Sequence, residues 1–165
     1  MSLMDAPAYD PKSDNRRRNI IIGILVALLL FVIVTFAGYI AGHGWLFSNL
    51  SYEHRINDFF NALEAKDYTK AYAIYNNDPK WQQHPAIYSN YPFARFTEDW
   101  TTDSPVNAPI TSHHVDKSVT SGSGRFGTGV IVAVRINGGH KIFMYINRVT
   151  KKITWPAPYV FQYNL

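Results

Sequence analysis

The sequence predicts an α+β domain carried by one membrane-spanning helix near the N-terminus. The segment from Ile20 to Ile40 reads IIIGILVALLLFVIVTFAGYI and contains no charged residue. After Ser51 the apolar residues recur with the period of a helix, and beyond Val115 they alternate with the period of a strand. Helices followed by a run of antiparallel strands are typical of the α+β class.

Length and composition exclude several classes of protein. A chain of 165 residues has room for one ordinary domain and an appendage. With 47% hydrophobic and 15% aromatic residues, the chain is expected to fold rather than to be disordered. It has no cysteine, which excludes disulfides and thiolate metal sites. A net charge of +4 is too small to indicate a nucleic-acid-binding protein.

The apolar segment has the length of a membrane span. At 1.5 Å per residue, a helix from Ile20 to Ile40 is about 31 Å long, which matches the hydrocarbon core of a bilayer. The rest of the chain is too short to surround such a helix on every side, so a buried core helix is not expected. A cleaved signal peptide is the alternative, but its apolar run is normally shorter, and we expect an uncleaved signal anchor. The small residues that suggest a cleavage site are Ala37, Gly38, Ala41 and Gly42.

Basic residues flank only the N-terminal side of this segment. Arg16, Arg17 and Arg18 adjoin it, whereas the first charged residues on the other side are Glu53 and Arg55. The positive-inside rule therefore places the N-terminus in the cytoplasm and the C-terminal domain outside. We expect a single-pass protein, most simply of a bacterial inner membrane, with a periplasmic or extracellular domain.

The chain divides into four expected segments. The first has two prolines and no apolar period, and is expected to be a disordered cytoplasmic tail. The linker carries aromatic residues where an interfacial belt would lie. The segments are the tail 1–18, the transmembrane helix 19–42, the linker 43–51 and the exported α+β domain 52–165.

The first part of the exported domain has the pattern of helices. A helix is expected to begin after Ser51, an N-cap residue that places Glu53 in the first turn. A second is expected from Tyr68 to Tyr75, and a third after Pro92, a residue suited to a first turn. The buried face of the first helix is predicted from the i, i+3, i+4, i+7 spacing of Ile56, Phe59, Phe60 and Leu63.

The second part has the pattern of an antiparallel meander. Asn137-Gly138 is a hairpin signal, because both residues accept a positive φ. The alternation of apolar residues predicts strands on both sides of this turn, and prolines at 156 and 158 are expected to stop the last strand. The expected strands are Val115–Val119, Val130–Ile136, Ile142–Ile146 and Ile153–Trp155.

Two helical segments carry a resemblance to a known superfamily. FFNALEAKDYTKAYAIY, from Phe59 to Tyr75, and YPFARFTEDW, from Tyr91 to Trp100, resemble the helices of the NTF2-like (cystatin-like) superfamily. The sequence also resembles small membrane-anchored bacterial proteins of uncharacterised function. The resemblance implies a curved antiparallel sheet wrapped around N-terminal helices to form a cone. It implies no function, because the superfamily hosts isomerases, dehydratases, transport factors and assembly proteins.

A cone of this kind can hold a ligand pocket if a carboxylate faces aromatic hydroxyls. Asp99 is the candidate carboxylate, although Glu98 and Asp99 fit the solvent-facing side of a helix equally well. The residues expected to line such a pocket are Tyr72, Tyr75, Trp81, Asp99 and Trp100.

Two other patterns are weaker. GSGRFG, from Gly122 to Gly127, matches a dinucleotide-binding pattern, but a strand rather than a helix is predicted after it, so linking glycines are expected. His113 and His114 are adjacent on a predicted strand and point to opposite faces, which does not suit chelation of one ion. No cofactor and no metal ion are expected.

Charge is distributed unevenly along the exported domain. Asp116 is the last acidic residue, and seven basic residues follow it, the last being Lys152. One interpretation is that acidic helices balance the sheet within the domain; the other is a basic surface that meets anionic headgroups or an acidic partner. The residues chosen for that basic surface are Lys141, Lys151 and Lys152.

No catalytic constellation emerges from these patterns. We therefore expect a membrane-anchored interaction or accessory domain outside the cytoplasm, without catalytic activity. A small-molecule-binding or acid–base cone, such as an isomerase or hydrolase, is the alternative. The expected partners are the lipid bilayer and a second protein or another copy of this chain, and not nucleic acid.

Overall fold

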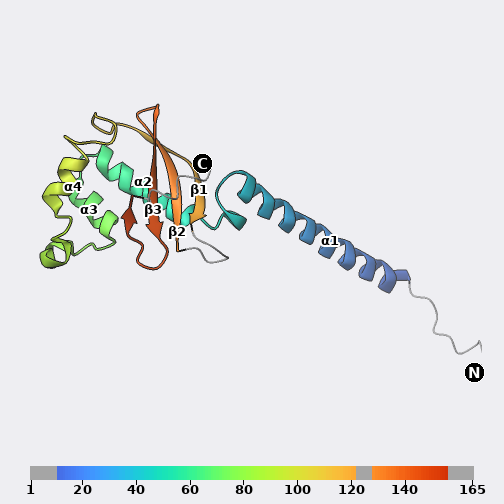
Figure 1. Ribbon diagram of the computed structural model, residues 1–165. Helices are drawn as coiled ribbons and strands as arrows, with labels where there is room; N and C mark the ends of the chain where they lie inside the picture. The colour runs from blue at the N-terminus through green and yellow to red at the C-terminus, as the bar shows by residue number, and fades with distance from the viewer. Residues whose placement is uncertain (1–10, 122–127, 156–165) are drawn as a thin grey trace, which may run out of the picture.

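The computed structural model describes residues 11–121 and 128–155, and consists of a long isolated helix joined to an α+β domain (Figure 1). Helix α1 spans Pro11–Ile40. Its segment Asn15–Ile40 is long and apolar enough to cross a membrane, and its apolar side chains are not buried by the rest of the protein. Because α1 begins at Pro11, the part of the expected disordered tail after residue 10 is helical, which corrects that boundary.

Glycine ends α1 in a defined way. The amide of His43 donates to the carbonyl of Gly38 at 3.0 Å, and the amide of Gly42 donates to that of Tyr39 at 3.1 Å. This is the Schellman pattern, which requires a left-handed residue just beyond the helix. Gly42 is that residue, with φ of 80°. Its missing side chain avoids a cost of about 1–2 kcal/mol.

Three further α-helices precede the sheet: α2 (Leu50–Glu64), α3 (Tyr68–Asn76) and α4 (Phe93–Asp99). The 3₁₀ turn η2 (Trp45–Phe47) lies between α1 and α2, and the turns η3 (Trp81–Gln83) and η4 (Pro85–Tyr88) lie between α3 and α4. The expected N-cap at Ser51 is wrong, because α2 begins at Leu50 with Asn49 in the capping position. A hydrogen bond from the Asn49 amide to the carbonyl of His43 turns the chain earlier than the local pattern suggests.

Four antiparallel strands form one sheet in the order β1-β2-β3-β4. The Asn137-Gly138 hairpin is confirmed, with φ of 48° and 75° at the two residues. It aligns Val132 of β2 with Met144 of β3. A bulge interrupts the pairing of β1 with β2 between Val115 and Lys117. The strands are β1 (His113–Ser121), β2 (Gly129–Ile136), β3 (His140–Asn147) and β4 (Ile153–Thr154).

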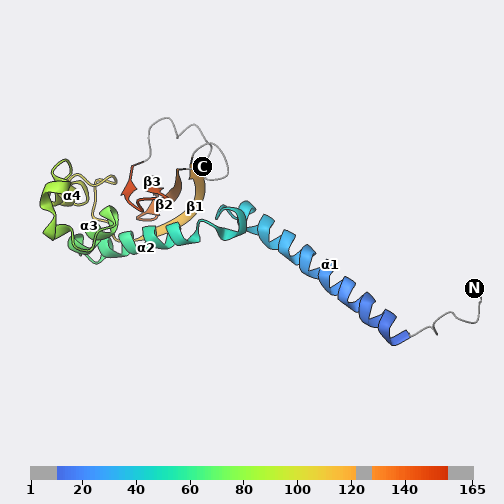
Figure 2. The same ribbon diagram turned by 90° about the horizontal axis from the view of Figure 1, so that it is seen from below.

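The core lies between the helices and one face of the sheet. The predicted apolar face of α2 is confirmed, and all four of its side chains are buried. They pack against the inward residues of β2, which are Val130, Val132, Val134 and Ile136. Helices α3 and α4 lie at the end of the domain far from α1, whereas β1 lies next to the end of α1 (Figures 1 and 2). The part of β1 around Ser118, which contacts Gly42, and helix α4 therefore lie at opposite ends of the domain.

Candidate functional site

The residues expected to line a pocket meet in one aromatic cluster at the end of the domain far from α1. Tyr72 and Trp100 are fully buried, and Tyr75 is 8% exposed. The ring of Tyr72 lies 4.8 Å from that of Trp81 and 5.0 Å from that of Phe96. Phe96 also contacts Tyr75 at 5.5 Å and Trp100 at 6.3 Å, so it links the two halves of the cluster. These rings contact one another edge to face or at a tilt, as aromatic side chains do in a packed core.

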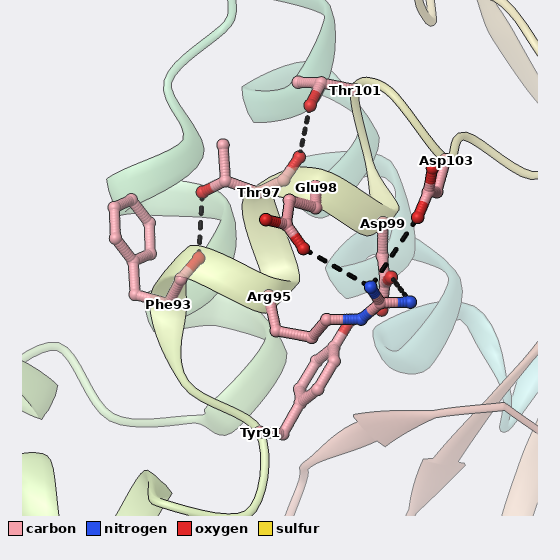
Figure 3. Close-up of polar contacts among 8 residues, drawn as sticks. All are labelled: Tyr91, Phe93, Arg95, Thr97, Glu98, Asp99, Thr101 and Asp103. Atoms are coloured by element: carbon pink, nitrogen blue, oxygen red, sulfur yellow. Dashed lines mark hydrogen bonds and ion pairs between the residues drawn. The ribbon is translucent and has the colours of Figure 1, made fainter.

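The polar atoms of this cluster are largely engaged within it. The hydroxyl of Tyr72 donates to the carbonyl of Tyr91 at 2.5 Å. The hydroxyl of Tyr91 donates to Oδ2 of Asp99 at 2.8 Å, and Arg95 binds Oδ1 of the same carboxylate at 2.8 Å (Figure 3). Both oxygens of Asp99 thus have a partner. In the described part of the chain this carboxylate serves to hold Tyr91 and Arg95 in place.

Helix α4 carries the remaining charges of this end of the domain. Arg95 also contacts Glu98 at 3.3 Å and Asp103 at 3.6 Å, and so lies among three carboxylates (Figure 3). Glu98 and Asp103 are more than half exposed. Exposed pairs of this kind contribute about 0–1 kcal/mol each. The expected solvent face of this helix therefore holds for Glu98, whereas Asp99 turns toward Tyr91.

Burial changes the acidity of the tyrosines in the cluster. Burial raises the pKa of Tyr75 to about 12, with a further contribution from Asp99. Burial, followed by the hydrogen bond to Asp99, raises the pKa of Tyr91 well above its usual value. A carboxylate nearby disfavours a second negative charge, and an apolar surrounding does so for any charge. Both hydroxyls are protonated at neutral pH, and that of Tyr91 donates its hydrogen bond to Asp99.

The three lysines chosen for a basic surface do not lie together. Lys141 follows the first residue of β3 and contacts Asp116 at 3.4 Å. Lys151 and Lys152 come after the other end of that strand, and about 20 Å of strand separates Lys141 from Asn147. Lys152 lies over the ring of Tyr88. The hydrogen bond from the Tyr88 hydroxyl lowers the pKa of Asp78, and Lys152 adds a smaller effect in the same direction.

The two adjacent histidines, His113 and His114, lie in different environments. Nδ1 of His113 lies 2.6 Å from Oε1 of Glu64, and its Nε2 lies 3.1 Å from Oδ1 of Asn57. Its ring stacks on Phe60, so His113 ties β1 to α2. His114 is exposed. Within residues 11–121 and 128–155, no group of three or more His, Asp and Glu side chains is arranged to hold a metal ion. The glycine-rich segment from Gly122 to Gly127 lies outside the described residues.

A second polar cluster, which the sequence reasoning missed, joins α1 to the domain. Oε1 of Glu53 accepts a hydrogen bond from the hydroxyl of Ser118 at 2.5 Å, and Oε2 lies 2.9 Å from Nδ1 of His43. The amide of Ser118 donates to the carbonyl of Gly42 at 2.7 Å. Glu53 and Ser118 are buried. We call His43, Glu53 and Ser118, with the carbonyl of Gly42, the polar joint, because it connects the end of α1, helix α2 and strand β1.

The order of groups in the polar joint does not suit nucleophilic catalysis. A serine nucleophile needs a base that takes its proton, with a carboxylate behind that base. Here the carboxylate of Glu53 lies between Ser118 and His43, and the hydroxyl proton is held by an oxygen of Glu53. The arrangement is that of a buried carboxyl group holding two chain segments in place.

Asn49 adds a buried polar side chain beneath the joint. It is fully buried, and within the described part of the chain neither atom of its side-chain amide has a hydrogen-bond partner. Gly44 lies directly against it, since a Cβ on Gly44 would come within 2.9 Å of Cγ of Asn49. The sequence offers only a weak signal for this region, namely that the polar residues Asn49 and Glu53 follow closely after the apolar helix. Ser118 lies far along the chain and carries no such signal.

Comparison of the chain with known protein families, curated proteins and solved structures found no match.

Proposed function

We propose that this chain is a single-pass membrane protein that presents an NTF2-like interaction or accessory domain outside the cytoplasm, at a fixed orientation to the bilayer, and that the domain acts by binding rather than catalysis. The observation that carries the proposal is the polar joint. A flexible tether needs no such contacts, whereas Glu53 and Ser118 hold the end of α1 against α2 and β1.

The retention of α1 as an anchor is supported by the small residues at its end. A Cβ on Gly38 would lie 2.9 Å from the carbonyl oxygen of Gly44 and from the amide of Phe47. Gly42 has the left-handed backbone that ends the helix, and its carbonyl accepts a hydrogen bond from the amide of Ser118. These residues thus have packing roles that do not involve a signal-peptidase site.

The orientation is supported by the positive-inside rule. Arg16, Arg17 and Arg18 lie on the N-terminal side of the apolar part of α1. On its other side, the sequence has no charged residue for more than ten positions, up to Glu53 and Arg55.

The preference for binding over catalysis is supported by the aromatic cluster. Its candidate carboxylate, Asp99, is engaged by Tyr91 and Arg95. The hydroxyl of Tyr72 is engaged by a backbone carbonyl. Side chains that hold one another in place stabilise a packed core, which supports a scaffold role for this cluster.

The anchor and its orientation can be tested with single cysteines, because the natural chain has none. Ser2→Cys and Ile87→Cys variants, expressed in intact cells, are treated with a membrane-impermeant maleimide. We expect Ile87→Cys, whose cysteine lies on the exposed surface of η4, to be labelled before lysis and Ser2→Cys only after lysis. The opposite pattern would reverse the proposed topology. Release of the Ile87→Cys domain into the medium or periplasm as a soluble, labelled product would indicate cleavage of the anchor.

The interaction role can be tested by photo-crosslinking in the native membrane. A photoreactive residue is placed at Ile87, which is 66% exposed, or at His140 on the β2–β3 hairpin. We expect a discrete protein adduct from at least one position. The absence of any adduct, combined with a small ligand that raises the unfolding temperature of the natural chain but not of Asp99→Asn, would support the ligand-binding cone instead.

A further inference from the structure

The turn η2 folds back along the end of α1. The ring of Trp45 lies 5.0 Å from that of Tyr39 and 5.9 Å from that of Phe36. Phe36 is one helical turn before Ile40, so Trp45 is level with the last turns of α1 rather than beyond them. The absence of a side chain on Gly38 permits this approach, since a Cβ there would collide with the backbone of Gly44 and Phe47.

The same turn exposes two large apolar side chains. Trp45 is 53% exposed and Leu46 is 49% exposed. Leu46 and Phe47 both have positive φ, of 50° and 56°, which L-residues rarely adopt. Such a backbone is maintained only where surrounding contacts require it. If α1 spans a bilayer, as proposed above, Trp45 and Leu46 lie at the depth of the outer interface, where tryptophan is enriched.

Two basic side chains lie beside the first turn of α2. Nζ of Lys151 donates to the hydroxyl of Tyr52 at 3.1 Å and lies 4.5 Å from the centre of its ring. The guanidinium of Arg148 lies 5.8 Å from the same ring and donates to the hydroxyl of Thr120 at 2.9 Å. Tyr52 is two residues after the start of α2, where Asn49 is still bonded to His43. Arg148 and Lys151 are therefore at the α1 end of the domain.

A third basic residue lies at the same end. The stem of Lys117 packs against Gly42, just beyond α1, because a Cβ on Gly42 would lie 2.7 Å from Cβ of Lys117. Within residues 11–121 and 128–155, no salt bridge involves Lys117, Arg148 or Lys151. Lys141, by contrast, pairs with Asp116. These three basic side chains, which have no acidic partner in the described part of the chain, are thus grouped near the end of α1.

The turn after β3 adds an apolar tip between two of these cations. Val149 is 88% exposed. Its amide and that of Thr150 donate to Oδ1 of Asn147 at 2.9 Å, so the turn has a defined shape. An exposed apolar side chain between Arg148 and Lys151 matches a lipid surface, which offers anionic groups above hydrocarbon.

We propose that the α1 end of the domain rests on the anionic headgroups of the outer leaflet. The contacting surface consists of Trp45, Leu46, Lys117, Arg148, Val149 and Lys151, and we call it the membrane-facing rim. The inference depends on the proposed membrane anchor and adds the partner, an anionic lipid surface. Because α1 already holds the domain beside the bilayer, the effective concentration of headgroups is high and a modest attraction suffices.

The test uses the full chain in lipid nanodiscs. A Val149→Cys variant, whose cysteine is unique, carries an environment-sensitive fluorophore, and the uncharged quencher acrylamide in the buffer quenches it. We expect quenching to be weaker by about twofold or more in discs that contain phosphatidylglycerol than in discs of phosphatidylcholine alone, since each rim cation is attracted to the anionic surface. High salt should remove the difference, because it shortens the screening length.

Matched double variants identify the surface. Lys117→Gln with Lys151→Gln should abolish the protection given by phosphatidylglycerol. Lys141→Gln with Lys152→Gln removes the same charge elsewhere on the domain and should leave the protection intact. Equal losses from both pairs would overturn the proposal in favour of net charge. Protection of the label in phosphatidylcholine discs by inorganic phosphate would overturn the assignment to lipid.

Different results would contradict the membrane anchor and the membrane-facing rim. A chain that does not co-elute with nanodiscs would contradict the membrane anchor, and the rim with it. A chain that incorporates normally, but is quenched equally in both lipid compositions, would contradict the rim alone.

Discussion

Glu53 connects three segments through one carboxyl group. Its two oxygens contact His43 and Ser118, which lie 10 and 65 positions away along the chain. A buried carboxyl group is costly unless it is hydrogen-bonded, and removing it leaves its partners unsatisfied as well. At the scale of single residues, the polar joint is therefore sensitive to a change at Glu53 itself.

Replacing Glu53 by Ala should lower the free energy of unfolding by about 2–4 kcal/mol, because a buried charge-assisted network loses its centre. The measurement is denaturant unfolding of the full chain in detergent, followed by tryptophan fluorescence. Glu98→Ala, which removes a carboxylate that is 60% exposed, is the control and should change stability by less than about 1 kcal/mol. Equal losses at the two positions would contradict a structural role for the joint.

A second prediction at this scale concerns alkaline pH. The pKa of Tyr75 in the folded chain is raised to about 12, mainly by burial. An unfolded tyrosine ionises near pH 10. Stability from the neutral hydroxyl is therefore complete below about pH 10 and is lost as the pH rises through about 12.

Tyr75→Phe keeps the ring contacts with Phe59 and Phe96 but cannot ionise. We expect its unfolding free energy to fall less steeply between about pH 10 and 12, by at most about 1.4 kcal/mol per pH unit. Stability curves of both proteins at several alkaline pH values provide the measurement. Parallel curves would show that Tyr75 ionises equally in the folded and unfolded chain.

At the scale of elements, α2 and β2 each contribute to more than one contact. One face of α2 holds Phe59 in the core, while its first turn holds Glu53 in the polar joint. Strand β2 lies between β1 and β3, and its outward residues Ile131 and Ala133 are buried as well as its inward ones. Cross-strand neighbours such as Tyr145, which is paired with Ile131, account for part of this cover.

The phase of α2 yields a direct stability prediction. Phe59→Asp places a charge in the core and should cost several kcal/mol, about 3–5 by comparison with other large core disruptions. Asn61→Asp, on the exposed side of the same helix, should be nearly silent. Thermal unfolding of the two variants side by side is the measurement. Similar losses would mean that the two positions do not differ in burial.

At the scale of the whole molecule, α1 projects from the domain as a rod (Figure 2), and the polar joint lies where α1 meets the domain. The aromatic cluster lies at the far end of the domain, and the basic residues of the membrane-facing rim lie at the near end. Anchor and surface chemistry are therefore arranged along one axis. On the proposed topology, this axis runs outward from the bilayer.

The basic residues before the span should govern that topology. Changing Arg16, Arg17 and Arg18 to Glu removes the charge difference across α1 and should reduce the fraction of chains with the domain outside. Labelling of Ile87→Cys by an impermeant maleimide measures this fraction. The same three positions changed to Lys keep the charge and should keep the orientation. An unchanged fraction in the Glu variant would contradict orientation by these arginines.

Local signals in the sequence determined much of the fold. The uncharged run predicted one long apolar helix, the helical spacing predicted the buried face of α2, and Asn137-Gly138 predicted the hairpin, and the structure confirms all three. Each of these three features depends on residues that are close together in the sequence. Their hydrophobic pattern and backbone preferences act without contacts to distant segments.

The functional geometry was decided by the tertiary structure. The sequence predicted Glu53 only as an acidic residue in the first turn of a helix. Its partner Ser118 lies on a strand that approaches it only in the folded domain. The sequence does not distinguish Lys141 from Lys151. In the structure, Lys141 forms an ion pair with Asp116, whereas Lys151 contacts Tyr52 near the end of α1. The physical reason is the same in each case. Burial and charge pairing depend on which distant segments pack together, and local periodicity carries no information about those contacts.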